Sequence, residues 1–79
     1  MDKKLVFEYD SEGDILYINK CSPYPEQDSE EFDYGVIVRL HTETEEIKNI
    51  EVMFFSKRLS KKHWFELPIT ADLRLSMNS

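Results

Sequence analysis

The side chains that could carry chemistry in this 79-residue chain form three groups: an acidic turn, a lone thiol with two histidines, and a basic aromatic stretch. The acidic turn holds Asp10, Glu12 and Asp14, and neighbouring carboxylates can bind Ca²⁺ or act as a general acid and base. The turn lacks the length and ligand number of a dedicated Ca²⁺ loop. Because Asp side chains also accept backbone hydrogen bonds in turns, a structural role is the favoured interpretation.

The thiol and imidazole groups do not form a recognisable site. Cys21, His41 and His63 are widely separated, whereas zinc sites need three or four ligands, commonly at short repeated spacing. No nucleophile turn surrounds Cys21, which precedes Ser22-Pro23 and is expected in a loop. We therefore assign no catalytic residue, no metal ligand and no cofactor, and the balance favours a protein that is not an enzyme.

The basic stretch is expected on a helix, where i, i+4 spacing stacks its four positive charges in two rows. Such a face could bind a nucleic-acid backbone with the tryptophan stacked on a base, or an acidic protein surface. The favoured interpretation is a solvated face whose charges meet the protein's own acidic strands. Its candidate partner-binding residues are Lys57, Arg58, Lys61, Lys62 and Trp64.

An acidic run contrasts with this basic stretch. Residues 26–46 contain eight acids and one base, Arg39. A pair of solvated loops is the usual explanation, but a cationic protein would be steered to such a surface. Aromatic side chains inside the run suit an interface, although strand packing explains them equally well. The candidate partner-binding residues are Glu30, Glu31, Phe32, Asp33 and Tyr34.

Alternation of apolar and polar residues predicts the elements that would position these groups. Four strands are expected, over residues 5–9, 15–19, 36–40 and 47–55, with Gly13 in the left-handed conformation between the first two. Residues 20–31 carry two prolines and are predicted to be a loop or an irregular edge. Ser56 is a candidate N-cap for a helix that ends before Leu67-Pro68. Residues 69–75 fit a strand or a helix, with a slight preference for the helix.

These elements predict a single α+β domain, a small antiparallel β-meander of about four strands in two consecutive hairpins packed against a short C-terminal helix. Residues 1–79 are treated as one domain, because about one small hydrophobic core is expected from a chain of this length. The predicted core residues are Leu5, Phe7, Tyr9, Leu16, Ile18, Val36, Val38, Leu40, Ile50, Val52, Phe54 and Leu59.

Composition and charge bound the function. The formal net charge of −6 disfavours nucleic-acid binding. That charge is uneven, because residues 56–79 hold five bases and only two acids. No apolar stretch predicts a membrane span or a signal peptide, so a cytoplasmic protein without a membrane partner is expected. A core this small with a single cysteine also makes a homodimer an expectation.

The order of several short motifs resembles a known family. These motifs are Phe7-Glu8-Tyr9-Asp10, Leu16-Tyr17-Ile18, Tyr34-Gly35-Val36-Ile37-Val38, Ile50-Glu51-Val52 and Phe55-Ser56-Lys57-Arg58-Leu59. Together they resemble the small bacterial family called domain of unknown function 2283, or YuzE-like. The resemblance covers residues 5–59, and residues 60–79 form a C-terminal extension. It implies a hairpin-rich α+β fold and no established enzyme activity. It also implies small toxin-like neighbours and hence an antitoxin-like role.

Three functions follow as hypotheses. The first is a non-catalytic protein-binding module, possible partners being a small basic protein, such as a toxin-like neighbour, or a second copy of the chain. The second is a small ligand-binding or enzymatic domain in which Asp10, Asp14, Lys57 and Arg58 converge. The third is weak nucleic-acid binding through residues 57–65.

Overall fold

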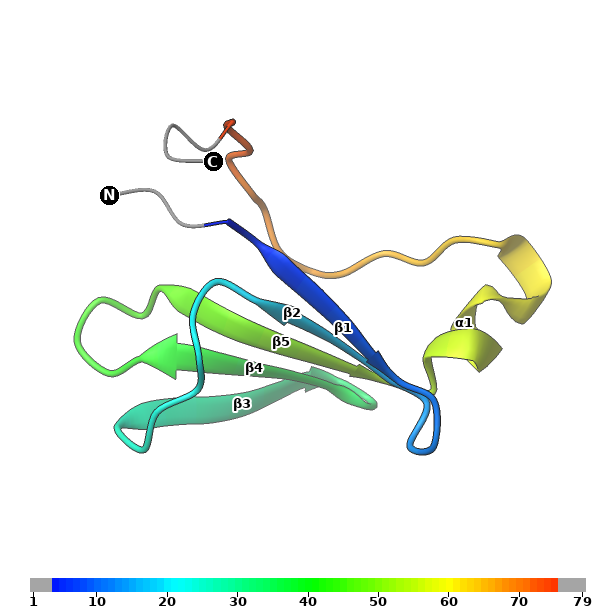
Figure 1. Cartoon of the computed structure of the whole chain (residues 1–79), viewed down its shortest axis with the longest axis horizontal. Helices are drawn as coiled ribbons and strands as arrows, with labels where there is room; N and C mark the ends of the chain where they lie inside the picture. Colours follow the sequence, from blue (N-terminus) through cyan, green and yellow to red (C-terminus); the bar gives the residue numbers. More distant parts are fainter. Residues whose placement is uncertain (1–3, 76–79) are drawn as a thin grey trace.

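The computed structural model of the protein describes residues 4–75 as a five-stranded antiparallel sheet followed by one helix and an extended segment (Figure 1). The strand order is β1-β2-β5-β4-β3, so the β1–β2 hairpin joins the β3–β4–β5 meander through the β2–β5 pairing. This confirms the predicted α+β class. The elements are β1 (Val6–Asp10), β2 (Ile15–Asn19), β3 (Gln27–Asp33), β4 (Val36–His41), β5 (Ile47–Met53) and α1 (Phe55–Lys62).

The fifth strand, β3, lies mostly within residues 20–31, for which the sequence predicted a loop or an irregular edge, and the structure shows the irregular edge. It pairs with β4 alone, with a bulge between Glu31 and Asp33, and is one edge of the sheet. An edge strand buries little of its surface, so its polar residues do not produce the apolar alternation that marks an inner strand. Pro23 and Pro25 precede the strand and lie in the connection from β2. The sheet therefore has five strands and not the predicted four.

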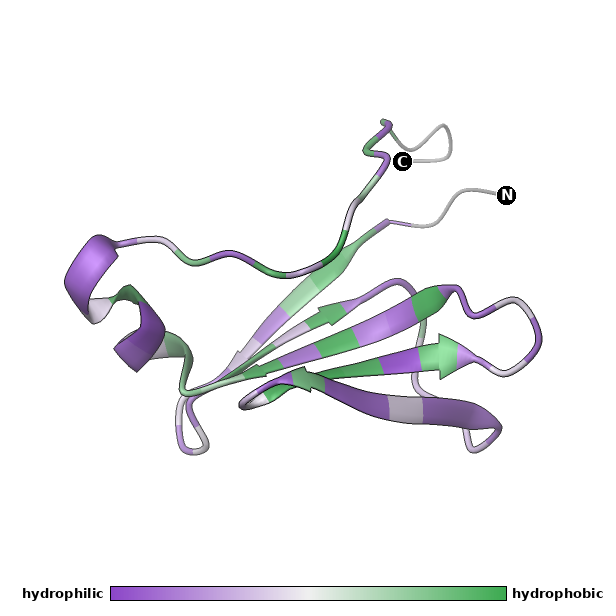
Figure 2. Ribbon diagram, turned by 180° about the vertical axis from the view of Figure 1, so that it is seen from behind, coloured by the Kyte–Doolittle hydropathy of each residue, from purple (hydrophilic) through white to green (hydrophobic). Residues whose placement is uncertain are grey.

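One face of the sheet holds the core. Val36, Val38 and Leu40 alternate along β4, and Ile50 and Val52 do so along β5; all five are buried, as predicted. Figure 2 shows the same alternation of apolar and polar residues along these strands. We call this the covered face and the opposite one the open face. The predicted Leu16 and Ile18 pack against the cluster from β2 while partly exposed.

The cover of this face is an extended segment rather than a helix. Phe65, Leu67 and Ile69 are half-buried against the core cluster, while the residues between them are exposed. Figure 1 shows the segment leaving α1 and running back past the sheet. Residues 69–75 form neither the favoured helix nor a strand. We call residues 64–75 the C-terminal strap.

Several predicted core residues lie outside the core. On the edge strand β1 and just before it, Leu5, Phe7 and Tyr9 are 43%, 60% and 49% exposed, because an edge strand has a sheet neighbour on one side only. Phe54 is also exposed, and Leu59 is only half-buried on α1. The strap supplies the apolar cover of the sheet that the prediction assigned to the C-terminal helix.

Candidate functional site

Asp14 joins the β1–β2 turn to the start of α1. Its Oδ1 accepts hydrogen bonds from the Tyr9 hydroxyl at 2.6 Å and the Ser56 backbone N–H at 3.0 Å, and its Oδ2 accepts one from the Ser56 hydroxyl at 2.8 Å. The Asp14 carbonyl also accepts the Phe55 N–H. Asp14 itself takes the left-handed conformation (φ 56°), not Gly13 as predicted. Asp tolerates this region better than most residues with a Cβ.

These hydrogen bonds shift the proton affinities of both side chains. The Tyr9 hydroxyl is the main cause that lowers the pKa of Asp14, and the Ser56 backbone N–H adds to it. The same bond to the carboxylate is the main cause that raises the pKa of Tyr9. The carboxylate is thus held in its charged form by donors from β1 and α1.

The same contacts change the assignment of the helix cap. The N-cap is Phe54, in the left-handed conformation (φ 57°) and with no side-chain cap, so the predicted N-cap role of Ser56 is wrong. Asp14 instead accepts the Ser56 N–H from across the chain, and places a negative charge at the positive end of the helix dipole.

Three of the four residues proposed for a ligand or catalytic site are engaged in separate internal contacts, whereas Lys57 is exposed and makes no side-chain hydrogen bond within residues 4–75. Asp10 Oδ1 accepts the Glu12 and Gly13 N–H groups within the turn. Arg58 donates to the carbonyls of Met53 and Tyr34, each at 2.6 Å. These contacts assign structural roles to Asp10, Asp14 and Arg58.

The acidic candidates lie along the outer edge of the sheet. The register with β4 places Asp28, Glu30 and Asp33 opposite Leu40, Val38 and Val36, on the covered-face side of β3, where all three are exposed. None of the three has an ion pair or a side-chain hydrogen bond within residues 4–75. Glu31 differs, because it accepts the Gly35 N–H at 2.9 Å. We call Asp28, Glu30 and Asp33 the acidic edge.

Two exposed aromatic candidates adjoin this edge. Phe32 is 47% and Tyr34 is 79% exposed, and the Tyr34 ring stacks on Phe54 with 5.5 Å between centroids and 7° between planes. Arg58 holds the carbonyl of Tyr34 from α1. The structure therefore brings the β3–β4 turn and the first turn of the helix together.

The basic candidates on α1 do not pair with the acidic sheet. The helix face is exposed, as the favoured interpretation has it, but no ion pair within residues 4–75 joins the helix to a strand, so its expected contact with the acidic strands is not found. Lys57, Lys61 and Lys62 are exposed, and Lys62 Nζ lies 5.2 Å from the centre of the Trp64 ring. The guanidinium of Arg58 donates to backbone carbonyls. Of the two predicted rows of positive charge, only the row of Lys57 and Lys61 therefore has both charges free within residues 4–75.

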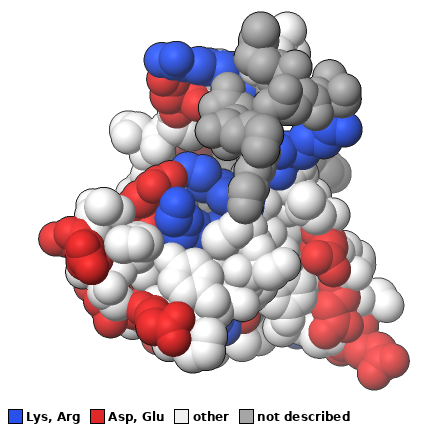
Figure 3. Space-filling model, turned by 60° about the vertical axis from the view of Figure 1, so that its left-hand side comes forward, with Lys and Arg blue, Asp and Glu red and all other residues white. Residues whose placement is uncertain are grey.

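The ion pairs that do form lie mainly within the sheet region. Glu46 forms ion pairs with both Lys20 and Lys48. The hydrogen bond from Lys20, followed by that from Lys48, lowers the pKa of Glu46 to about 2. Arg39 on β4 pairs with Glu51 on β5 at 2.7 Å. Figure 3 shows the acidic side chains of one face in several separate groups, with basic side chains near its middle and at its upper margin.

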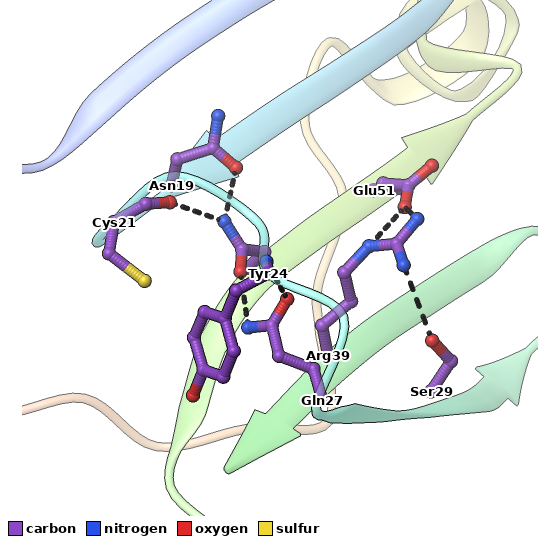
Figure 4. Close-up of polar contacts among 8 residues, drawn as sticks. Asn19, Cys21, Tyr24, Gln27, Ser29, Arg39 and Glu51 are labelled. Carbon is purple, nitrogen blue, oxygen red and sulfur yellow. Dashed lines mark hydrogen bonds and ion pairs between the residues drawn. The ribbon is translucent and has the colours of Figure 1, made fainter.

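A buried amide, Asn49, is a structural residue that the sequence analysis missed. It is 1% exposed; its Oδ1 accepts Gln27 Nε2 at 2.8 Å, and its Nδ2 donates to Asn19 Oδ1 at 2.9 Å and the Cys21 carbonyl at 2.7 Å (Figure 4). These bonds hold both ends of the β2–β3 connection against the open face. The alternation of β5 gave no signal for it, because Asn49 shares the polar side of the strand with Glu51.

Two shallow hollows lie on the surface, one beside Cys21 and the other beside Phe32. One is lined by the β1 residues Val6 and Glu8 and the start of the β2–β3 connection, and the other lies beside the strap at Leu67 and Ile69. Within residues 4–75, no three His, Cys, Asp or Glu side chains are grouped to hold a metal ion. In the same range no helix has the length and apolar character needed to cross a bilayer.

Comparison with known proteins places the chain in a family. The family model described as "Protein of unknown function (DUF2283)" matches residues 7–56, more than half of the chain, so the chain belongs to this family. The match covers β2 to β5 in full and all of β1 except Val6, and it ends at the start of α1. No curated protein and no solved structure matches the chain.

Proposed function

We propose that this member of the DUF2283 family is a non-catalytic module that binds a small basic protein along the acidic edge of β3. The observation that carries the proposal is that three exposed carboxylates on one edge strand have no cationic partner in the described part of the chain. Unpaired acids in a row steer and orient a positively charged protein.

The backbone of β3 supports this proposal. The outer side of β3 has no neighbouring strand in the sheet, so alternate N–H and C=O groups there are open to a partner. An extended segment of another protein can add to such an edge, with backbone bonds supplying affinity and side chains supplying specificity. Residues i and i+2 on a strand lie about 6.6 Å apart, so Asp28 and Glu30 suit basic residues at alternate positions of that segment.

The aromatic residues next to the edge supply an anchor. Tyr34 is the more exposed, and its stacking on Phe54 fixes the ring before any partner arrives. A pre-positioned aromatic side chain loses little conformational freedom on binding, and Tyr is enriched among residues that dominate interface energies.

A second copy of the chain does not suit this edge. Antiparallel pairing of two β3 strands would set carboxylates against carboxylates, and directly opposed like charges destabilise a strand pair. The partner is therefore basic where it meets β3. In the finer, antitoxin-like form of the proposal, it is a toxin whose cationic surface the acidic edge covers.

Co-expression with the product of the adjacent gene, followed by measurement of binding rates at several salt concentrations, tests the proposal. The variant D28K/E30K should slow association about tenfold, because it reverses two charges of the acidic edge. The control E43K/E45K makes the same change in the β4–β5 turn and should have a smaller effect. Absence of a complex with the wild-type chain, or equal losses in the two variants, would overturn the proposal.

Nucleic-acid binding through α1 is the second candidate, favoured by the free lysines and by Trp64, which is 52% exposed. Binding of single-stranded RNA should weaken steeply with rising salt and should be reduced by K61E/K62E. Binding that is absent at low salt would exclude this function.

A further inference from the structure

The two edges of the sheet carry opposite chemistry. The acidic edge of β3 is charged and bulged, two features that protect an edge strand from pairing with itself. The other edge, β1, pairs with β2 in an unbroken register and exposes Val6, Phe7 and Tyr9. None of the backbone hydrogen bonds that the structure places outside the helix and strands involves residues 5–9. The outer side of β1 is therefore open.

We propose that β1 pairs antiparallel with β1 of a second copy of this chain, with Val6 on the two-fold axis and Lys4 opposite Glu8 of the partner. This inference is independent of the proposed function, which concerns the opposite edge. It joins two five-stranded sheets into one continuous sheet.

Symmetry restricts the possible registers. A two-fold axis perpendicular to the sheet leaves the covered face of both copies on the same side, so directly opposed residues must come from the same face. Residues 5, 7 and 9 of one copy therefore pair with residues of the same set in the other copy, and residues 4, 6, 8 and 10 likewise pair within their own set. The pairing of β1 with β2 establishes these two sets, because it places Phe7 and Tyr9 opposite Ile18 and Leu16 of the covered face.

Charge selects among the registers that remain. With Glu8 on the axis, two carboxylates would face each other, which is destabilising. With Phe7 on the axis, Lys4 would face Asp10, whose carboxylate already accepts hydrogen bonds in its own turn.

With Tyr9 on the axis, Glu8 would face Asp10. With Leu5 on the axis, only residues 4–6 of the described strand would pair. The register that remains has Val6 on the axis and places Lys4 opposite Glu8 at both ends of the paired segment. Neither residue has an ion pair within residues 4–75.

The same register buries the exposed apolar side chains of the edge. Leu5 faces Phe7 of the partner twice on the covered-face side, and the two Val6 side chains meet on the open face. Val6, Leu5 and Phe7 are each more than 40% exposed in the single chain, so pairing removes apolar surface from water. A cross-strand aromatic–aliphatic pair adds to the backbone bonds.

Charge exchange provides the first test, with sedimentation velocity over a concentration series as the measurement. The wild-type chain should dimerise, and K4E and E8K should each weaken dimerisation about tenfold or more. The double variant K4E/E8K should recover the wild-type constant within about threefold, because it exchanges the two charges. D28K on β3 is the matched control and should leave the constant unchanged. A monomeric wild-type chain, or no recovery in the double variant, would refute the interface.

Cysteine cross-linking provides a second test that does not depend on charge. In a C21S background, V6C should form an interchain disulfide on mild oxidation, because directly opposed strand residues have Cα atoms about 4.5–5.5 Å apart, within the range a disulfide spans. S29C, an exposed residue of the open face on the other edge strand, is the control and should form little cross-link. Equal cross-linking of the two variants would contradict the proposal and indicate random encounter.

Discussion

One carboxylate, that of Asp14, satisfies donors from two parts of the chain that the sequence separates widely. It binds the Tyr9 hydroxyl from β1 and both the hydroxyl and the N–H of Ser56 from α1. The N-cap residue Phe54 has no hydrogen-bonding side chain, so it cannot cap the first turn of α1 itself. A residue that resembles half of a catalytic pair in sequence is thus the cap of a helix in the structure.

The variant D14N should be less stable than the wild type at pH 7, and the difference should shrink in acid. Asn tolerates the left-handed conformation, so the substitution removes charge without backbone strain. Folding lowers the pKa of Asp14 below 3.8, so its charge stabilises the fold above that pH and this stabilisation is lost as the pH falls through the folded value. Urea unfolding at pH 7, 4 and 3 measures the difference.

The control for this comparison is D28N, which also removes one negative charge but lies on the free acidic edge. It should show little change in unfolding free energy across the same range, since exposed surface changes are usually small. A gap between D14N and wild type that stays constant from pH 7 to pH 3 would argue against a charge-dependent cap.

At the scale of elements, the sequence predicted those parts whose burial is periodic. β4 and β5 alternate because one face meets the core, whereas β2 is half-buried throughout and was predicted from its run of apolar residues. The predicted bounds of all three strands were close to those observed. β3 is an edge and carries polar residues on both faces, so period alone does not reveal it. The Asp14 cap depends on contacts between turn and helix that no local spacing encodes.

The C-terminal strap is a second segment whose structure the alternation of apolar residues does not reveal. Phe65, Leu67 and Ile69 do alternate, but Pro68 lies among them and the segment belongs to no sheet. Its period of two therefore comes from one side packing on the core rather than from strand pairing. Without knowledge of the sheet face it covers, alternation there is equally compatible with a strand.

Leu67→Ala should lower the free energy of unfolding by about 1–2 kcal/mol, less than the roughly 2–5 kcal/mol typical of a fully buried leucine because Leu67 is half-buried. Glu66→Ala, on the exposed side of the strap, should stay within about 0.5 kcal/mol of the wild type. Chemical denaturation measures both. Equal effects would show that the strap does not cover the core through its alternate residues.

At the scale of the molecule, opposite edges of one sheet have distinct surfaces. The strand order sets β1 and β3 four strand spacings apart, which at about 4.8 Å each is about 19 Å. Contacts at one edge therefore need not obstruct the other. The charges of the sheet and helix are also left available, since no ion pair within residues 4–75 connects them.

This separation predicts an assembly of two chains and two partners. If β1 joins the copies and each β3 holds one basic protein, light scattering on the purified complex should give the mass of a 2:2 assembly. The variant K4E should give a 1:1 complex whose dissociation constant for the partner stays within about threefold of the wild type, because sites this far apart act additively. D28K/E30K should show the converse, an intact dimer that associates with the partner about tenfold more slowly. A K4E chain that also loses the partner would show that the two edges are coupled, and that binding at β3 requires the dimer.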